Sequence, residues 1–366
     1  MHDARLLIDT LRLSAPTDVG ALESAWCRAD VAALVRLAHF EGVSLWLHRR
    51  LKTLGITLSG EAGDALAAAA KRAMAYSLRM ESETSATLSI LDAEGIAAVP
   101  LKGAAMRRIS ARVPFATARA PNDVDVLVQD AEAQRAWDAM VARGYAPPKE
   151  QGPADGHHLP ALAGPLGVGV EIHLTTAASV PPAEAWRRAT TDSAVVELNG
   201  VTHSIPSDTE LFWHAVTHAV THAEEFGREG TRLRYWLDPA ALLAAGAPID
   251  WARVRARLAT KECADPGLVR AWIRTASELS GQSLPAGALG HHGPAIDVVR
   301  MLSWRQRVFD RYEPGNRWAE RLIEEGARGE TGLRPEPAYH EATSLARVRH
   351  AVAARVGRVW WRLRRP

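Results

Sequence analysis

The fold of this chain is decided by the stretch Arg119-Ala-Pro-Asn-Asp123-Val-Asp125-Val-Leu-Val128, where two carboxylates stand two residues apart inside an apolar, β-branched run. Side chains at positions i and i+2 of a β-strand leave the same face of the sheet. We therefore expect Asp123 and Asp125 to point to one side, while the valines pack into the sheet. Paired oxygen ligands of this kind are what a nucleotide-bound Mg²⁺ requires.

A second apolar run, Val168-Gly-Val-Glu171-Ile-His173-Leu174, has the same period of two. It offers a third carboxylate, Glu171, with His173 on the same face. An Asp-x-Asp pair also occurs on the solvated face of ordinary antiparallel sheets, so the pair alone does not indicate catalysis. Three acids on neighbouring strands, however, predict a metal site.

A phosphate-binding turn is predicted upstream of the two aspartates. The apolar run 96–101 ends in Lys102-Gly103 and passes directly into a predicted helix. Glycine lets the backbone come close to a ligand, and the free N–H groups at the start of a helix favour phosphate. We expect Lys102 to add a point charge for the same phosphates.

Five segments follow one another along the chain: Leu101-Lys102-Gly103, Arg119-x-x-x-Asp123-x-Asp125, Val170-Glu171-Ile172-His173, Pro206-Ser-Asp-Thr-Glu210 and Arg234-Tyr-Trp-Leu-Asp238. Together they resemble an uncharacterised nucleotidyltransferase family of the DNA polymerase β-like superfamily. Members of that family include proteins encoded beside lasso-peptide biosynthesis genes. The resemblance covers roughly residues 85–245.

The resemblance implies an α+β fold with a small mixed or antiparallel sheet flanked by helices. It also implies that Asp123 and Asp125 bind two Mg²⁺ ions, with Mn²⁺ as the alternative, and that Glu171 completes the metal site. A nucleoside triphosphate would be the donor, and pyrophosphate would leave in line. The wider superfamily has Gly-Ser where this chain has Lys102-Gly103, and an ammonium cannot reproduce a hydroxyl that both donates and accepts.

Arginines near the two aspartates have two interpretations each. Arg119 either binds phosphate, which suits its planar pair of donors, or pairs with the nearby carboxylates. The cluster formed by Arg107, Arg108 and Arg112 either helps to hold a triphosphate or faces water.

Several histidines are further candidates. His214, His218 and His222 share one helical face. Zinc can use such spacing, but the chain lacks the glutamate of a His-Glu-x-x-His motif, and a face of this kind also packs against a neighbouring domain or lines a polar cleft. We expect His218 to face the nucleotide site, where His173 also belongs. His157-His158 either reaches the substrate phosphate or the metal site, or lies in a solvated loop.

Composition limits the class of protein. The chain has 366 residues, 47% of them hydrophobic, which is enough for two or three domains. A formal net charge of +2 excludes a strongly basic nucleic-acid binder. Only Cys27 and Cys263 occur, and neither a signal peptide nor an apolar run near the ~20 residues of a membrane span is evident. These features predict a cytoplasmic protein.

The predicted organisation is a helical N-terminal subdomain (1–94), a nucleotidyltransferase-like core (95–206), a helical C-terminal domain (207–325), a linker or loop (326–341) and a basic amphipathic tail helix (342–366). A long helix over 63–91 is expected to end at Gly95. The runs 195–198 and 201–205 around Asn199-Gly200 predict a hairpin that closes the sheet. Asp238-Pro239 is expected to break a C-terminal helix.

The tail 342–366 contains seven arginines and no acid, and its apolar residues keep helical spacing. A basic amphipathic helix with Trp360 and Trp361 can lie on an anionic membrane, bind nucleic acid or dock on a partner. The alternative is an ordinary terminal helix that packs on its own domain.

Two function classes compete. The first is an enzyme that transfers a nucleoside monophosphate, or a related phosphoryl-linked group, from an activated donor to a hydroxyl or phosphate on a modified peptide, an RNA or a small molecule. The donor is a nucleoside triphosphate or, as the alternative, a nucleotide-sugar. The second is a nucleotide-binding or scaffold protein, of the antitoxin type, without turnover. Asp123, Asp125 and Glu171 favour the enzyme, because a binding module does not require three acids at one place.

Overall fold

The computed structural model describes residues 2–14, 16, 18–113, 123–148, 156–198, 201–226, 232–260, 263, 265–290 and 294–311. The helices and strands follow in this order: α1 (His2–Leu11), α2 (Val19–Arg28), α3 (Val31–Phe40), α4 (Ser44–Leu54), α5 (Gly60–Ala93), β1 (Ala98–Pro100), α6 (Lys102–Arg108), β2 (Asp123–Val128), η1 (Asp130–Glu132), α7 (Ala133–Ala142), β3 (Leu162–Ala163), β4 (Gly169–His173), α8 (Pro182–Thr190), β5 (Ala194–Leu198), β6 (Val201–Ile205), α9 (Asp208–Phe226), α10 (Arg234–Ala244), α11 (Trp251–Leu258), α12 (Pro266–Ser280) and α13 (Val298–Arg311).

Four strands form one small mixed sheet in the order β1-β2-β4-β3. The central strands β2 and β4 are parallel, whereas β1 and β3 pair antiparallel at the two edges. Val124 and Val126 are fully buried between the acids of β2, as the period of two predicts. The predicted α+β class, with a small mixed sheet flanked by helices, is therefore confirmed.

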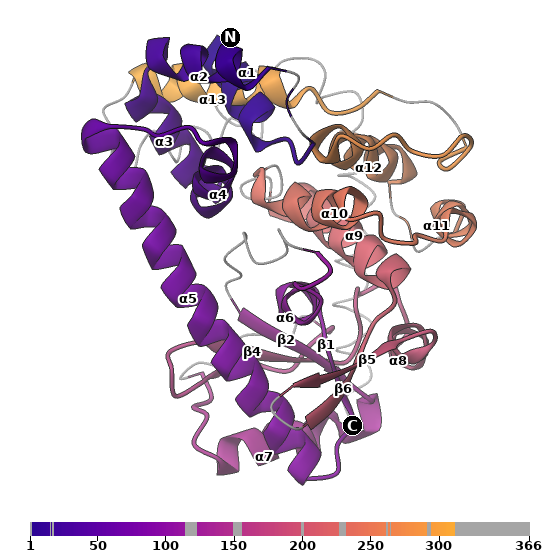
Figure 1. Ribbon diagram of the computed structural model, residues 1–366. Coiled ribbons are helices and arrows are strands. Elements are labelled where there is room, and N and C mark those ends of the chain that lie inside the picture. The colour runs from indigo at the N-terminus through magenta and orange to yellow at the C-terminus, as the bar shows by residue number, and fades with distance from the viewer. Residues whose placement is uncertain are drawn as a thin grey trace.

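Helices α5 and α7 cover one face of this sheet (Figure 1). Met80 and Leu88 of α5 and Met140 of α7 share an apolar cluster with the buried valines of β2. The predicted long helix is confirmed as α5, and Gly95 follows it with φ of +67°. Because this face is apolar, the acids of β2 must lie on the opposite face.

The first and the last described helices share one hydrophobic core at the other end of the molecule (Figure 1). Leu7, Leu34 and Trp46 of the N-terminal helices belong to the same cluster as Trp236 and Trp272 of α10 and α12. The rings of these two tryptophans stack with their centroids 4.0 Å apart. The domain boundaries expected from the sequence stay a prediction, and the segments 326–341 and 342–366 lie outside the described residues.

Glu41 ties three parts of this core together. Its side chain is fully buried and pairs with Arg305 of α13, which is 3% exposed. It also accepts a hydrogen bond from the backbone N–H of Leu233, at 2.9 Å, just before α10. A buried carboxylate needs such partners, because transfer of an unpaired charge out of water is costly.

A close approach between the N-terminal segment and α12 gives a first prediction. Gly281 and Gly55 both follow a helix with φ near +72°. A Cβ on Gly281 would lie 2.3 Å from Ser14, whereas a Cβ on Gly55 would meet nothing within 4 Å. We expect Gly55→Ala to lower the free energy of unfolding by about 1 kcal/mol, and Gly281→Ala to lower it by a further 1–3 kcal/mol or so.

Urea unfolding of the two glycine variants, followed by circular dichroism, measures this difference. Equal losses of stability in both variants would contradict the packing of Ser14 against the end of α12.

Two local expectations differ from the structure. The hairpin β5–β6 forms as predicted, but as a separate two-stranded sheet rather than as the closing strands of the main one. Asp238-Pro239 does not break a helix, because α10 continues through Pro239. All residues of α10 from Tyr235 to Leu243 are buried, and this packing offsets the hydrogen bond that the proline cannot donate.

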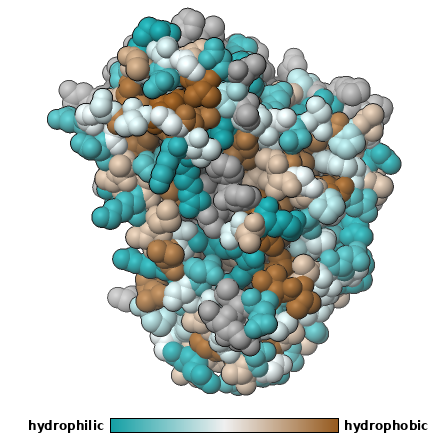
Figure 2. All heavy atoms as spheres, in the orientation of Figure 1, coloured by the Kyte–Doolittle hydropathy of each residue, from teal (hydrophilic) through white to brown (hydrophobic). Residues whose placement is uncertain are grey.

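Figure 2 shows a largely hydrophilic face, with brown atoms gathered over the N-terminal helices and in smaller areas at the height of the sheets. The exposed large apolar side chains among the described residues are Val19, Met74, Leu78, Leu166 and Val195. They are spread over α2, α5, the loop before β4 and β5. Within the described ranges, none of the helices has the length and the apolar character needed to span a membrane.

Candidate active site

Asp125 and Glu171 lie side by side on the two central strands. The parallel register of β2 and β4 makes them direct partners, and it pairs Asp123 with Gly169. Side chains at alternate positions share a face, so Asp123, Asp125 and Glu171 all leave the face opposite to α5 and α7. The sequence expectation of acids that meet on one face of neighbouring strands is confirmed.

Lys102 reaches this carboxylate pair from the start of α6. Its Nζ lies 2.6 Å from Oδ1 of Asp125, and the backbone N–H of Leu101 donates to the carbonyl oxygen of Asp125 at 2.9 Å. Lys102 has φ of +45°, which costs a residue with a side chain roughly 1–2 kcal/mol. Backbone strain of this kind concentrates at functional sites, where the surrounding structure holds it.

His173 completes the cluster from the end of β4. Its Nε2 lies 2.8 Å from Oδ1 of Asp125 and 3.3 Å from Oε2 of Glu171. Burial and Lys102 disfavour the charged imidazole, but the hydrogen bonds to the two carboxylates outweigh them and raise the pKa of His173. Although burial acts in the opposite direction, Lys102 and His173 hold the pKa of Asp125 well below its usual range.

The donor atoms of Asp125, Glu171 and His173 all lie within 4.8 Å of one another. Two carboxylates and an imidazole are a set of ligands that a divalent cation accepts. Burial opposes the charge on Lys102, but the surrounding carboxylates, Asp125 and Asp123 foremost, raise the pKa of its ammonium. The single ammonium faces three carboxylates, those of Asp123, Asp125 and Glu171. Because negative charge is in excess, the site favours a further cation, and these residues fit a metal.

Asp123 stands at the more open end of the same face. Its side chain is half-buried. Burial of Tyr76 on α5 raises the pKa of that phenol, and the negative charge of Asp123 raises it further. Gly103 is buried in α6 next to Lys102. Arg119 lies outside the described residues. Phosphate binding by Lys102 and Gly103 stays a prediction, because the ammonium of Lys102 contacts Asp125.

The arginine cluster after Lys102 has a structural environment that neither interpretation foresaw. Arg107 donates to the carbonyl oxygen of Ser77 at 2.7 Å, and Arg108 pairs with Glu81. Both arginines are buried, so they tie α6 to α5. Arg112 forms a bidentate pair with Asp208 at the start of α9.

The segment before β3 brings two more histidines to the acids. His158 lies opposite His173 in an isolated β-bridge, and its Nε2 is 3.9 Å from Oε2 of Glu171. The ring of His157 lies 5.6 Å from that of His173, measured between centroids. The rings of this histidine pair therefore approach the acidic site, which agrees with the first of the two interpretations rather than with a solvated loop.

The charges of the site affect His214 of α9. Burial, followed by the charges of Lys102 and His173, lowers its pKa to about 3. The ring of His218 lies 6.0 Å from that of His214 and 6.3 Å from that of Tyr235. A role of His218 in nucleotide binding stays a prediction, and the side chain of His222 is outside the described residues.

The sequence predicts His173 among the nucleotide-site residues but not among the metal ligands, whereas its donor atom lies within 4.8 Å of those of Asp125 and Glu171. The alternation Glu-Ile-His on β4 carries the signal for this placement. Sequence reasoning did not foresee the ion pair between Lys102 and Asp125, because the two residues are 23 positions apart and no local pattern relates them.

A family model described as an uncharacterised nucleotidyltransferase matches residues 28–276. This range contains the whole sheet, α5 and the helices α9 to α11. No curated protein and no solved structure matches the chain.

Proposed function

We propose a specific reaction for this chain, which belongs to the family of uncharacterised nucleotidyltransferases and is therefore a transferase. The enzyme moves a nucleoside monophosphate from a nucleoside triphosphate to an acceptor hydroxyl or phosphate, with Mg²⁺ as its metal. The observation that carries the proposal is the pairing of Asp125 with Glu171 on parallel strands, with Lys102 and His173 in contact with the same carboxylate. Charge neutralisation and positioning are what phosphoryl transfer requires of a protein.

In the proposed reaction, Asp125 and Glu171 would hold Mg²⁺, with Asp123 beside them. Mn²⁺ is the alternative, because it also accepts an imidazole ligand. When bound, a divalent ion supplies charge neutralisation at the triphosphate. Lys102 keeps a further positive charge at the site, which favours the negatively charged donor. His173 orients Asp125 through its hydrogen bond of 2.8 Å.

The bond changes of the proposed reaction balance simply. A bond forms between the acceptor oxygen and the α-phosphorus, and the bond from the α-phosphorus to the bridging oxygen of the β-phosphate breaks. Pyrophosphate leaves with that electron pair, and the proton of an acceptor hydroxyl passes to a site carboxylate and then to solvent.

The proposal names the reacting group of the acceptor but not a single class of acceptor molecule. A modified peptide, an RNA and a small molecule all carry hydroxyl or phosphate groups that fit the reaction. An anionic membrane or nucleic acid that binds the tail 342–366 would bring one class of acceptor to the enzyme. A reducing cytosol suits a chain whose two cysteines form no disulfide with each other.

Isothermal titration of ATP, GTP, CTP and UTP, each with MgCl₂, into the full chain tests the proposal directly. We expect at least one nucleotide to bind in a metal-dependent manner, and the variant Asp123→Asn/Asp125→Asn to weaken that binding about tenfold or more. Asp130→Asn, which changes an exposed carboxylate just after β2, is the matched control.

Pyrophosphate release from the same samples, with cell extract as the source of acceptor, separates the enzyme from a binding module. Binding together with pyrophosphate supports the transferase. Binding without pyrophosphate favours the nucleotide-binding scaffold, and failure of all four nucleotides to bind contradicts the site itself.

A further inference from the structure

Asp125 stands between the other two carboxylates of the site. Glu171 is its direct partner on β4, and Asp123 precedes it by two residues on β2. Where two metal ions bind at one site, they lie about 3.5–4 Å apart, and a carboxylate that bridges them gives one oxygen to each ion. Asp125 is therefore the carboxylate that a pair of ions would have to share.

One oxygen of Asp125 is committed to nitrogen donors. Nζ of Lys102 lies 2.6 Å from Oδ1, and Nε2 of His173 lies 2.8 Å from the same atom. Both hydrogen bonds that the described residues make to this carboxylate fall on Oδ1. A carboxylate oxygen has two lone pairs, so both lone pairs of Oδ1 are used. Asp125 therefore keeps one oxygen, Oδ2, for a metal ion.

The fold holds the ammonium of Lys102 in this position. The backbone N–H of Leu101 donates to the carbonyl oxygen of Asp125 at 2.9 Å, which fixes the residue before Lys102 against β2. The side chain of Lys102 is 11% exposed. Burial disfavours its charged form, but Asp125 and Asp123 outweigh burial and raise the pKa of Lys102, so the ammonium is charged at neutral pH. A cation at Oδ1 would meet this charge at close range, where Coulomb repulsion is strong.

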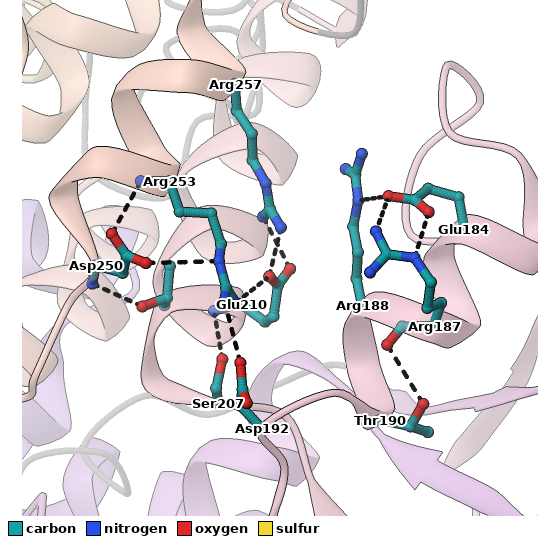
Figure 3. Close-up of polar contacts among 11 residues, drawn as sticks. Glu184, Arg187, Arg188, Thr190, Asp192, Ser207, Glu210, Asp250, Arg253 and Arg257 are labelled. Carbon is teal, nitrogen blue, oxygen red and sulfur yellow. Dashed lines mark hydrogen bonds and ion pairs between the residues drawn. The ribbon is translucent and has the colours of Figure 1, made fainter.

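Two carboxylates outside the site have a different charge environment (Figure 3). Glu184 on α8 contacts two guanidinium groups, those of Arg187 and Arg188, each at 2.6 Å. Glu210 on α9 forms a bidentate pair with Arg257, one branch of which measures 2.8 Å. Each of these carboxylates therefore has at least one guanidinium in direct contact.

At the site, one ammonium serves three carboxylates. Lys102 faces Asp125, Asp123 and Glu171, and among these described groups the excess is two negative charges when His173 is neutral and one when it is protonated. In the absence of nucleotide, one divalent cation offsets either excess. Two divalent cations would leave positive charge in excess beside a buried ammonium, which is costly.

We infer that the site binds one divalent cation rather than two, and that the ammonium of Lys102 provides the further positive charge for the transfer. The inference deepens the proposed function and rests on it for the role of the ion. It departs from the two Mg²⁺ ions that the family resemblance implies for Asp123 and Asp125. Lys102 is then a positive charge built into the fold, and the bond changes of the proposed reaction are the same with one ion.

Electron paramagnetic resonance of the full chain with MnCl₂ tests the inference, because Mn²⁺ accepts the same oxygen ligands as Mg²⁺. The number of bound ions per chain follows from the signal of free Mn²⁺. Two bound ions that share a carboxylate couple magnetically and give a spectrum unlike that of an isolated ion. We expect one uncoupled Mn²⁺ per chain, with MnCl₂ alone and with one equivalent of the α,β-methylene analogue of the nucleotide that binds by titration.

Variants of Lys102 identify the cause of the single ion. We expect Lys102→Met to bind a second Mn²⁺, coupled to the first, at least about tenfold more tightly than the wild type does. Lys102→Arg keeps a positive charge and is expected to bind one ion. Lys52→Met removes an exposed lysine on α4 and is the matched control, also with one ion. Lys102→Gln replaces the Met variant if the latter does not fold.

The outcomes separate this inference from the proposed function. One ion in the wild type and a coupled pair in Lys102→Met support the inference. A coupled pair in the wild type overturns it and leaves the proposed function in place. One ion in both proteins means that the ammonium does not exclude a second ion, which also overturns the inference. If no Mn²⁺ binds to the wild type, the metal site fails, and the proposed function fails with it.

Discussion

We expect Asp125→Asn to lower kcat/KM for pyrophosphate release about 10³-fold or more. A steady-state assay with the nucleotide identified by titration measures this change. Asp125 is 1% exposed, and its carboxylate contacts both Lys102 and His173. The amide keeps the shape of the side chain but removes its negative charge. The loss therefore falls on charge and on metal binding rather than on packing.

Two controls accompany this substitution: a variant that removes an exposed carboxylate outside the site, and a measurement that the Asp125→Asn protein is folded. Asp130→Asn is expected to keep kcat/KM within about twofold, because exposed carboxylates away from a site contribute little. Circular dichroism and the midpoint of thermal unfolding verify that the Asp125→Asn variant is folded. A folded variant with kcat/KM within tenfold of wild type would refute the role of Asp125 in the reaction.

Glu41→Gln produces the largest expected loss of stability, about 3–5 kcal/mol in the free energy of unfolding. The substitution leaves the buried guanidinium of Arg305 without its carboxylate and removes a charged acceptor from the N–H of Leu233. Removal of one partner from a buried ion pair is costly because the other charge stays buried. Urea unfolding followed by fluorescence measures the change.

Two further variants define the origin of that loss. Asp9→Asn, which breaks an exposed pair with Arg5 on α1, is expected to change the stability by less than about 1 kcal/mol. The double variant Glu41→Leu/Arg305→Met removes both charges and is expected to recover most of the stability. If the double variant is as unstable as Glu41→Gln, packing rather than charge explains the effect.

The sequence predicted the local features of the site because β-strand periodicity is a local property. The alternation around Asp123 and Asp125 placed them on one face, and the same period placed Glu171 and His173 together. The register that sets Asp125 directly beside Glu171 depends on how two strands 40 or so residues apart are paired, and a period of two does not specify it.

The elements that differed from expectation were decided by tertiary packing. Pro239 reads as a helix breaker, yet the buried side chains around it hold α10 together. His214 was one of three histidines on a helical face, and only the fold shows that it lines a pocket between α8 and α9, whereas the ring of His218 lies 6.3 Å from that of Tyr235. No sequence window contains both α8 and α9, so the pocket between them could not be predicted.

The long helix α5 has a consequence for any attempt to separate the molecule into parts. Its 34 residues extend about 50 Å, and Leu66 near its start and Met80 and Leu88 farther on belong to different hydrophobic clusters. A fragment that begins after α5 would leave the valine face of the sheet open to water. The chain should therefore unfold in a single cooperative transition, in which the sheet that carries the carboxylates and the helical half lose their structure together.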